Sequence, residues 1–503
     1  MIKKPKKFYI TTSLAYTNAL PHIGFALELI QADVLARYHR VLGEDVFFLT
    51  GTDEHGTKVA RKAEESGKNP KDFTDELSNK FKQLAKVLNL SNNDFIRTTD
   101  QKRHWPAVQI AWKKFEENGD IYKKKYRGLY CVGCEAFITK KDLVEGKCEI
   151  HQKEPEAIEE ENYFFKLSKY SEKIKELIKK DEIKIIPEER KNEMLSFVEQ
   201  GLDDISFSRP RKDLEWGIPV PGDDSQTIYV WADALTNYIS ALDYPKGKNF
   251  EKFWPADIHF LGKDILRFHS IIWPAMLLSL KLPLFKKIFV HGFITSDGQK
   301  MSKSLGNVVN PFELIEKYGT DAVRYFLLRE ISPTQDGDFT HEKFKERYNA
   351  DLANGVGNLI SRVLTLIEKR FDGKILKSLK KEPSLLIEKK ENYNKLLVDL
   401  KIDQVLKEIM LICSDLDNRI DKEQIYKADS LVLSDALYIF AETIRIWAWL
   451  VSPFLPETAD KVFERLGLDI KKEKNKKFEE AIKWGGLKPG TKIKKGSPLF
   501  PRI

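Results

Sequence analysis

Residues 26–50 read ALELIQADVLARYHRVLGEDVFFLT, and this stretch decides the fold. Its first part carries apolar residues at spacings of 3, 4, 4 and 3, namely Leu27, Ile30, Val34, Tyr38 and Val41. This spacing predicts a helix over residues 26–42, and Gly43 follows it, as is typical of a helix C-terminus. The segment 45–50, DVFFLT, is a continuous apolar run, which is typical of a strand buried on both faces of a parallel sheet.

The residues before this stretch complete a repeating unit. A short β-rich run at residues 8–12 precedes a loop at 13–25, so the order is strand, loop, helix, strand. This order predicts a doubly wound, Rossmann-like α/β domain. Ligands of such a domain bind beyond the carboxyl ends of the strands, where the loop 13–25 and the stretch 51–56 lie.

Further along, the composition changes twice. Residues 116–225 have more charge, short strands and a cysteine cluster; a strand pattern then returns in TIYVWADAL (227–235), DIHFLGKDI (257–265) and residues 287–293. From about residue 346 amphipathic helices follow, at 350–367 and 434–449. We therefore predict one α/β domain split by an insertion and followed by a helical bundle. The halves of the α/β domain are 1–115 and 226–295, and the insertion is 116–225. A loop region at 296–345, the bundle at 346–470 and a basic, loosely ordered tail at 471–503 complete the chain.

Composition sets limits on function. The chain has 503 residues, 42% hydrophobic and 32% charged, with a formal charge of +8, which permits a nucleic-acid partner without requiring one. It has no uninterrupted apolar span of about 18 residues and no N-terminal leader pattern, so we predict a cytoplasmic protein without a membrane partner. Four cysteines are too few for a disulfide scaffold.

Two short segments indicate phosphate chemistry. Residues 298–307, GQKMSKSLGN, place two lysines and two serines between glycines, which suits phosphate oxygens, although the chain contains no GxxxxGK[ST] loop. Residues 22–25, HIGF, lie just before the first predicted helix, whose N-terminal amides favour anions. Alone, HIG is more often a plain loop; the pair, in this order on one split fold, is specific.

These segments resemble the two signatures of the class I aminoacyl-tRNA synthetases, and the chain is most similar to the methionyl-tRNA synthetases. The resemblance runs from about residue 8 to 345 with strong motifs, and to about 460 with weaker ones. It implies ATP-dependent activation of L-methionine and its transfer to tRNA(Met), initiator tRNA included, by a monomer, with Mg²⁺ accompanying ATP. The family's HIGH signature ends in Phe25 here, so one contact to the ATP phosphates is lost or supplied by another group. The resemblance also assigns 296–345 to the KMSKS loop and a stem-contact region, and 346–470 to anticodon binding.

The resemblance implies roles for individual residues. Catalytic roles fall to His22, Lys300 and Lys303, and ATP binding adds Gly24, Gly262, Asp264 and Ser302. The methionine pocket is assigned to Leu14, Tyr16, Trp231, Tyr238, Ile265 and His269. Asp53 suits the substrate ammonium, and the tyrosine hydroxyl and histidine suit weak hydrogen bonds to sulfur. Ordinary core packing is the alternative for Trp231 or Ile265 taken singly, and a helix N-cap is the alternative for Asp264; Leu235 stands where the family commonly has proline.

The cysteine cluster has the spacing of a zinc site. YCVGCEAF supplies C-x2-C, and KCEIH follows after 13 intervening residues with C-x2-H, so the ligand set is Cys131, Cys134, Cys148 and His151. A full set of four protein ligands predicts one structural Zn²⁺ per chain. Cys413, alone in a predicted helix, is expected to be a small core residue. The insertion is too short to hold the large editing domain of the Leu, Ile and Val synthetases.

The helical region carries a weaker signal. By resemblance, Asn358 and Arg362 of NGVGNLISR are candidates for anticodon bases, and Tyr426 for stacking where the family has Pro-Trp; an exposed helix face is the alternative for all three. Two other functions stay open. Phe25 and the missing tryptophan fit a zinc-stabilised tRNA-binding protein that has lost activation. Another class I synthetase, such as the cysteinyl enzyme, is a nearer alternative, although metal ligands are then expected in its active site.

Overall fold

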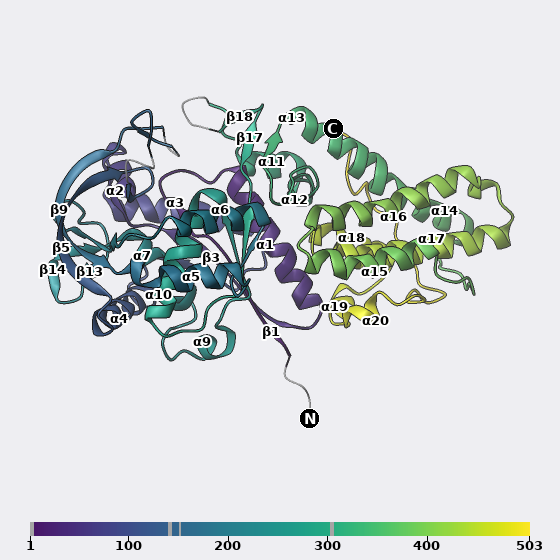
Figure 1. Ribbon diagram of the computed structural model, residues 1–503. Helices are drawn as coiled ribbons and strands as arrows, with labels where there is room; N and C mark the ends of the chain where they lie inside the picture. The colour runs from purple at the N-terminus through teal and green to yellow at the C-terminus, as the bar shows by residue number, and fades with distance from the viewer. Residues whose placement is uncertain (1–4, 139–142, 150–151, 302–305) are drawn as a thin grey trace.

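The structure, a computed structural model, describes residues 5–138, 143–149, 152–301 and 306–503 (Figure 1). An α/β part holds the N-terminal half of the chain, and a bundle of helices holds the C-terminal part (Figure 1). Helices α1 and α12 lie between the two (Figure 1). None of the helices in these described ranges is both long and apolar enough to span a lipid bilayer.

A seven-stranded sheet with parallel neighbours forms the centre of the α/β part, which confirms the predicted doubly wound fold. The strand order is β10 (Lys184–Ile186), β16 (Lys287–His291), β15 (Ile258–Gly262), β1 (Lys7–Thr12), β3 (Asp45–Asp53) and β2 (Ala15–Tyr16), with β4 (Asp94–Arg97) also paired to β3. The central strand β1 pairs Ile10 with Phe48 on one side and with Ile258 on the other. Helices pack around it: α1 (Ile23–Val41), α2 (Thr57–Glu65), α3 (Pro70–Val87), α4 (His104–Glu117) and α10 (Trp273–Ser279).

The opening stretch folds as its pattern indicates, with two extensions. Helix α1 begins at Ile23 instead of residue 26, because the His22 side chain caps it by accepting a hydrogen bond from the Gly24 N–H. Gly43 follows the helix with φ +80°, a conformation that suits glycine. Strand β3 continues past Thr50 to Asp53, since β4 and the short β2 pair with its last residues.

The segment between the halves contains antiparallel sheets. One has the order β11 (Ile205–Ser206), β9 (Glu156–Phe165), β5 (Ile121–Cys131) and β6 (Ala136–Ile138); the hairpin β7 (Leu143–Val144) and β8 (Lys147–Cys148) lies between β6 and β9 in sequence. Helices α5 (Ser171–Lys179) and α6 (Glu188–Glu199) flank β10 in sequence. Because β10 pairs with β16, part of the range predicted as an insertion returns to the main sheet. The predicted domain boundaries stay predictions.

One strand prediction is wrong. The run TIYVWADAL contains only the end of β14 (Asp223–Ile228), which pairs with β12 (Ser208–Pro210) and β13 (Pro219–Val220) outside the main sheet. Helix α7 (Val230–Leu235) then begins, and α8 (Asn237–Ser240) and α9 (Lys248–Phe253) follow. A short apolar run buried on all sides has no period that separates strand from helix, and α7 is almost wholly buried.

Beyond β16 the chain forms a small sheet and then the bundle. The sheet contains β17 (Ile294–Ser296), β18 (Gln299–Lys300) and β19 (Gly337–Phe339), and the helices α11 (Pro311–Tyr318), α12 (Thr320–Arg329) and α13 (His341–Arg347) accompany it. The predicted helix 350–367 is a π-helical segment, Tyr348–Gly357, continued by α14 (Asn358–Phe371). The bundle adds α15 (Ser384–Val398), α16 (Ile402–Lys422), α17 (Ser430–Val451) and α18 (Pro456–Arg465), and Cys413 of α16 is buried, as predicted.

The C-terminal tail is packed, unlike the loose order expected from its lysines. It contains α19 (Ile470–Lys474) and α20 (Phe478–Ala481), and it buries Leu487 and Phe500. Two buried residues of α17 hold it. Arg445 donates to the Ala481 and Lys483 carbonyls, and Glu442 accepts from the Gly486 and Leu487 N–H groups. Backbone partners of this kind do not depend on the charge of the tail's own side chains.

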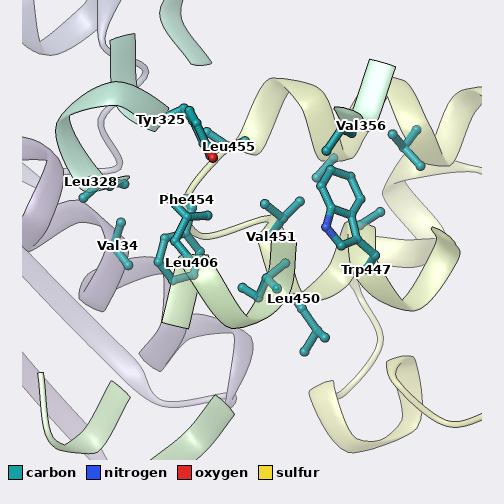
Figure 2. Packing of buried hydrophobic residues seen from close by; sticks show 14 of the residues in the cluster. Val34, Tyr325, Leu328, Val356, Leu406, Trp447, Leu450, Val451, Phe454 and Leu455 are labelled. Atoms are coloured by element: carbon teal, nitrogen blue, oxygen red, sulfur yellow. The ribbon is translucent and has the colours of Figure 1, made fainter. Parts of the chain in front are cut away.

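The sheet and the bundle meet at a buried ion pair. Arg324 of α12, fully buried, lies 2.8 Å from Asp33 of α1 and donates to the Phe454 and Pro453 carbonyls beyond α17. Apolar side chains surround this joint: Figure 2 shows Val34 of α1 and Leu328 of α12 beside Phe454 and Leu406. The helix that begins at the HIG segment is therefore fixed to the bundle.

Candidate active site at the carboxyl edge of the sheet

The two predicted phosphate segments lie together. The Ile23 N–H at the start of α1 donates to the carbonyl of Val309, which follows the KMSKS segment, at 3.2 Å. His22 is exposed, and its Nδ1 accepts the Gly24 N–H at 3.1 Å. A neutral imidazole whose Nδ1 is an acceptor carries its proton on Nε2, so His22 presents a donor at a helix N-terminus, where anions are favoured.

Phe25 does not leave an empty place on this helix. Its ring packs edge-on against Phe81 of α3, with centroids 5.2 Å apart. The position therefore contributes packing where the family signature has a polar side chain. We predict that Asn18 or a water supplies the contact to phosphate that the family's second histidine makes.

The base of the KMSKS loop is held by a carboxylate. Asp338 of β19 accepts hydrogen bonds from the Gly298 N–H at 2.7 Å and from the Thr295 hydroxyl at 2.7 Å. Lys300 is exposed, in a turn that Gly298 closes with φ +72°. Ser302 and Lys303 lie outside the described residues.

The residues predicted to face adenosine, Gly262 and Asp264, lie at the end of β15, beside the end of β16. Gly262 ends β15, and a Cβ there would lie 2.8 Å from Asp264 Oδ1 and 3.6 Å from His291 Nε2, so a larger residue would have to displace the Asp264 side chain. Asp264 is exposed, as expected of a group that meets a ligand. His291 donates through Nε2 to Glu28 at 2.9 Å. Burial lowers the pKa of His291, but the hydrogen bond and charge of Glu28 more than offset it, so the pKa is raised.

Sequence reasoning missed His291 and Glu28. Glu28 is buried on α1 and also accepts from the Ser13 N–H and hydroxyl, at 2.7 and 2.8 Å, so it joins the ends of β1 and β16. The available signal was a histidine at the carboxyl end of a predicted strand and a carboxylate within the apolar helix.

The predicted ammonium partner, Asp53, is buried at the end of β3. Its Oδ1 has no hydrogen-bond partner among the described residues. Burial raises the pKa of Asp53 well above its usual value, and the nearby carboxylates Asp233 and Glu135 raise it further. Asp233 itself pairs with two histidines, His55 and His104, each at 2.6 Å. A buried carboxyl without a cation partner favours a ligand that brings a positive charge.

Aromatic residues of the predicted pocket come from several elements. Tyr16 of β2 is the register partner of Asp53, and Trp231 of α7 stacks on Phe268 with centroids 3.8 Å apart. Leu14 and Ile265 are half-buried and pack against the same apolar cluster. His269 contacts both Trp231 and Tyr238 and lies beside the Ile265 carbonyl, whereas Leu14 is placed only by its packing against the cluster, so the full pocket stays a prediction.

The hydrogen bond predicted between this pair and a sulfur needs correction. His269 Nδ1 lies 3.0 Å from the Ile265 carbonyl, which accepts only, so that nitrogen carries the ring proton. His269 Nε2 then accepts the Tyr238 hydroxyl at 2.7 Å, and burial lowers the pKa of His269 to about 4, which keeps it neutral. The single hydroxyl proton is used within the pair. In this arrangement Tyr238 and His269 form a fixed, uncharged surface, and neither has a proton left to donate to a sulfur atom.

Three of the four predicted metal ligands form a cluster. The Sγ atoms of Cys131, Cys134 and Cys148 lie within 4.8 Å of one another, and those of Cys134 and Cys148 are 3.6 Å apart. Two sulfurs bound about 2.3 Å from a tetrahedral ion lie roughly 3.7 Å apart, whereas a disulfide needs about 2.05 Å. This donor set fits a metal ion. His151 lies outside the described residues.

The three anticodon candidates lie apart from this edge, in the bundle. Asn358 begins α14 and is exposed, and Tyr426 is 44% exposed after α16. Arg362 of α14 is bound to α16, because it lies 2.7 Å from Asp417 and 2.5 Å from Asp421. A base that reaches Arg362 therefore competes with two carboxylates.

Known proteins share this architecture. The family described as tRNA synthetases class I (M) matches residues 8–149 and 138–364. A methionine–tRNA ligase of Caldanaerobacter subterraneus subsp. tengcongensis is 45% identical over 514 aligned residues, 99% of this chain and 79% of its own length. One of Brucella melitensis biotype 1 is 42% identical, with 99% and 98% covered. The solved structure of Mycobacterium tuberculosis methionyl-tRNA synthetase in complex with methionyl-adenylate has a TM-score of 0.92 and 38% identity, with 99% and 100% covered.

Proposed function

We propose the roles of the site residues from one premise: the chain belongs to the methionine–tRNA ligases, within the class I tRNA synthetases. Its reaction is the ATP-dependent activation of L-methionine, followed by transfer of the methionyl group to tRNA for protein synthesis. A carboxylate oxygen of methionine attacks the α-phosphorus of ATP, and pyrophosphate leaves. A ribose hydroxyl of the tRNA then attacks the carbonyl carbon of methionyl-adenylate, and AMP leaves.

The buried Asp53, whose Oδ1 has no hydrogen-bond partner among the described residues, carries the assignment of the amino-acid end. Asp53 binds the methionine ammonium, which supplies the missing cation. Tyr16, Trp231 and the neutral pair Tyr238–His269 enclose the thioether side chain. The pocket thereby excludes water and directs the carboxylate of methionine toward the N-terminus of α1.

The other end of the site binds ATP. His22 Nε2–H and the amides at the start of α1 bind phosphate oxygens, and Gly24 and Gly262 allow close approach of the ligand. Asp264 accepts from the ribose hydroxyls. Lys300, Ser302 and Lys303 stabilise the negative charge that develops on the leaving pyrophosphate, so little covalent help from the protein is needed. An Mg²⁺ ion accompanying ATP would supply further positive charge there.

Two further partners belong to this proposal. One structural Zn²⁺ is held by Cys131, Cys134, Cys148 and His151 and supplies local folding energy. The bundle, with Asn358, Arg362 and Tyr426, binds the anticodon of tRNA(Met), the initiator included. The chain acts as a monomer in the cytoplasm.

Amino-acid-dependent exchange between ATP and pyrophosphate tests the function. Exchange is expected with methionine and not with cysteine, leucine or isoleucine, since an apolar pocket discriminates by about 1–3 kcal/mol per methylene and more where a buried polar group goes unpaired. Faster exchange with cysteine, leucine or isoleucine than with methionine would reject the methionine assignment. No exchange at all, with tRNA still bound, would favour the tRNA-binding protein without activation.

Metal analysis tests the cysteine site. Protein purified without chelator is expected to contain one zinc per chain, and Cys131→Ser is expected to lose most of it. Because the metal stabilises a local module, limited proteolysis should then cut near β7 and β8 while the α/β part stays folded. The matched control is Cys413→Ser, at a buried cysteine far from the cluster in sequence, which should keep its zinc. Zinc-free wild-type protein would contradict the site.

A further inference from the structure

The turn that joins the metal cysteines to β6 also touches the proposed amino-acid pocket. Glu135 directly follows Cys134; it is 4% exposed and has φ +50°. One carboxylate oxygen accepts the Tyr16 hydroxyl at 2.7 Å, and the other accepts the Tyr130 hydroxyl at 2.5 Å. The Lys58 N–H at the start of α2 donates to the same oxygen as Tyr16. A buried carboxylate with three donors is both satisfied and fixed in place.

The neighbouring residue of the same turn, Cys134, binds a second aromatic side chain of the proposed pocket, Trp231. The carbonyl of Cys134 accepts the indole N–H of Trp231 at 3.3 Å. Tyr16 comes from β2 and Trp231 from α7. Cys134 and Glu135 therefore form a two-residue brace that holds side chains from two distant parts of the chain. Within the described residues, Cys134 and Glu135 thus connect the cysteine cluster directly to both aromatic side chains.

The surroundings leave the brace little freedom. A Cβ on Gly56 would lie 2.5 Å from the Tyr16 hydroxyl and 3.0 Å from the Glu135 carboxylate, and Gly56 has φ +111°. On the other side, the Arg209 guanidinium lies 4.2 Å from the Tyr130 ring centroid and is itself bound by Glu160. The Tyr16 hydroxyl is therefore oriented by Glu135 between closely packed groups.

We propose that Glu135 is a positioning residue for methionine recognition: through its hydrogen bond to Tyr16 it holds the aromatic wall of the pocket in the binding conformation. This rests on the proposed function of the pocket. Glu135 does not touch the reacting atoms, and its effect belongs to substrate affinity. Without the brace, Tyr16 is mobile in the free protein and must be ordered when methionine binds. This cost weakens the affinity for methionine and leaves the rate of the chemical step unchanged.

Two substitutions at Glu135 separate positioning from general packing. Glu135→Ala is expected to raise the Kd and KM for methionine about tenfold or more, with kcat and the KM for ATP within about threefold, as expected for a lost hydrogen bond to a charged group. Glu135→Gln is expected to stay within about threefold of wild type, because its amide oxygen still accepts from Tyr16 and Lys58 while its NH₂ donates to the Tyr130 oxygen. Exposed Glu154 in the same module provides the control, Glu154→Ala, with no change expected.

Coupling to Tyr16 is the sharper test. Tyr16→Phe removes only the hydroxyl and should weaken methionine binding in the same direction, and Glu135→Ala/Tyr16→Phe should bind no more weakly than Glu135→Ala alone. Methionine affinity is measured by calorimetry, exchange by pyrophosphate incorporation and zinc by elemental analysis. Zinc content is expected to equal that of wild type in every variant.

The outcomes are distinct. Wild-type affinity in Glu135→Ala, or effects of Glu135→Ala and Tyr16→Phe that multiply independently, would overturn the proposal. Zinc loss in both Glu135 variants would also overturn it, because the residue would then act through the metal site. If the wild type binds methionine without exchange, the proposed activity fails, while the calorimetric comparison still decides the role of Glu135.

Discussion

Asp53→Asn is expected to lower kcat/KM for methionine about a hundredfold or more, with most of the loss in KM. The carboxyl is buried, and its Oδ1 has no partner among the described residues. Methionine therefore brings the only cation proposed for this position, and asparagine leaves that ammonium desolvated without a counter-charge. Removal of one partner of a buried, hydrogen-bonded charge pair costs about 2–5 kcal/mol. Each 1.4 kcal/mol is a factor of ten in affinity.

A residue on the same strand provides the control for this experiment. Asp45 begins β3, at the edge away from the site, and pairs with Lys252. Asp45→Asn is expected to leave the methionine KM unchanged. The measurement is methionine-dependent exchange over a range of methionine concentrations at saturating ATP. An unchanged methionine KM in Asp53→Asn would mean that the ammonium binds elsewhere.

Arg324→Met is expected to lower the free energy of unfolding by about 3–5 kcal/mol, because it breaks a buried ion pair and leaves Asp33 with a single cation partner. It also removes donors from the Pro453 and Phe454 carbonyls at the joint between sheet and bundle. Arg37→Met, which removes the more exposed partner of the same Asp33, should cost less. The measurement is the denaturant midpoint followed by tryptophan fluorescence.

A substitution of Asp33, the other member of the ion pair, tests why Arg324→Met is less stable. Because the Arg324–Asp33 pair needs both charges, Arg324→Met/Asp33→Asn should lose less stability than the sum of the losses in the two single variants. Equal midpoints for Arg324→Met and Arg37→Met would show that burial of the pair contributes little to the joint.

Local patterns predicted much of this molecule. The helix and strand of residues 26–50 depend on apolar spacing, and the phosphate segments and cysteine ligands depend on residue types at short range. These features are predictable because each depends only on residues that are close together in the sequence. The α/β class and the bundle follow from them, and the rule that ligands bind at the carboxyl edge of a parallel sheet places the site, whereas the individual pocket residues came from the family resemblance.

The misses have a common physical origin. The run 227–235 is apolar at nearly every position, so it has no periodicity to separate a strand from the helix α7 that forms. The role of His291 depends on Glu28, and that of Glu135 depends on Tyr16, which are contacts across 263 and 119 residues of chain. No local pattern contains them. The proton of Tyr238 is likewise assigned only by the position of the Ile265 carbonyl beside His269.

The contact between α17 and the tail has a consequence for the order in which the protein is made. Glu442 and Arg445 are synthesised well before their backbone partners, which lie 36 to 45 residues further along the chain. Until those residues leave the ribosome, the two charges have each other but lack the amides and carbonyls that complete their burial. We therefore expect the bundle to close late: a released chain that ends at residue 475 should display α17 in a protease-sensitive form, and a chain that ends at residue 490, past all four backbone partners, should protect it.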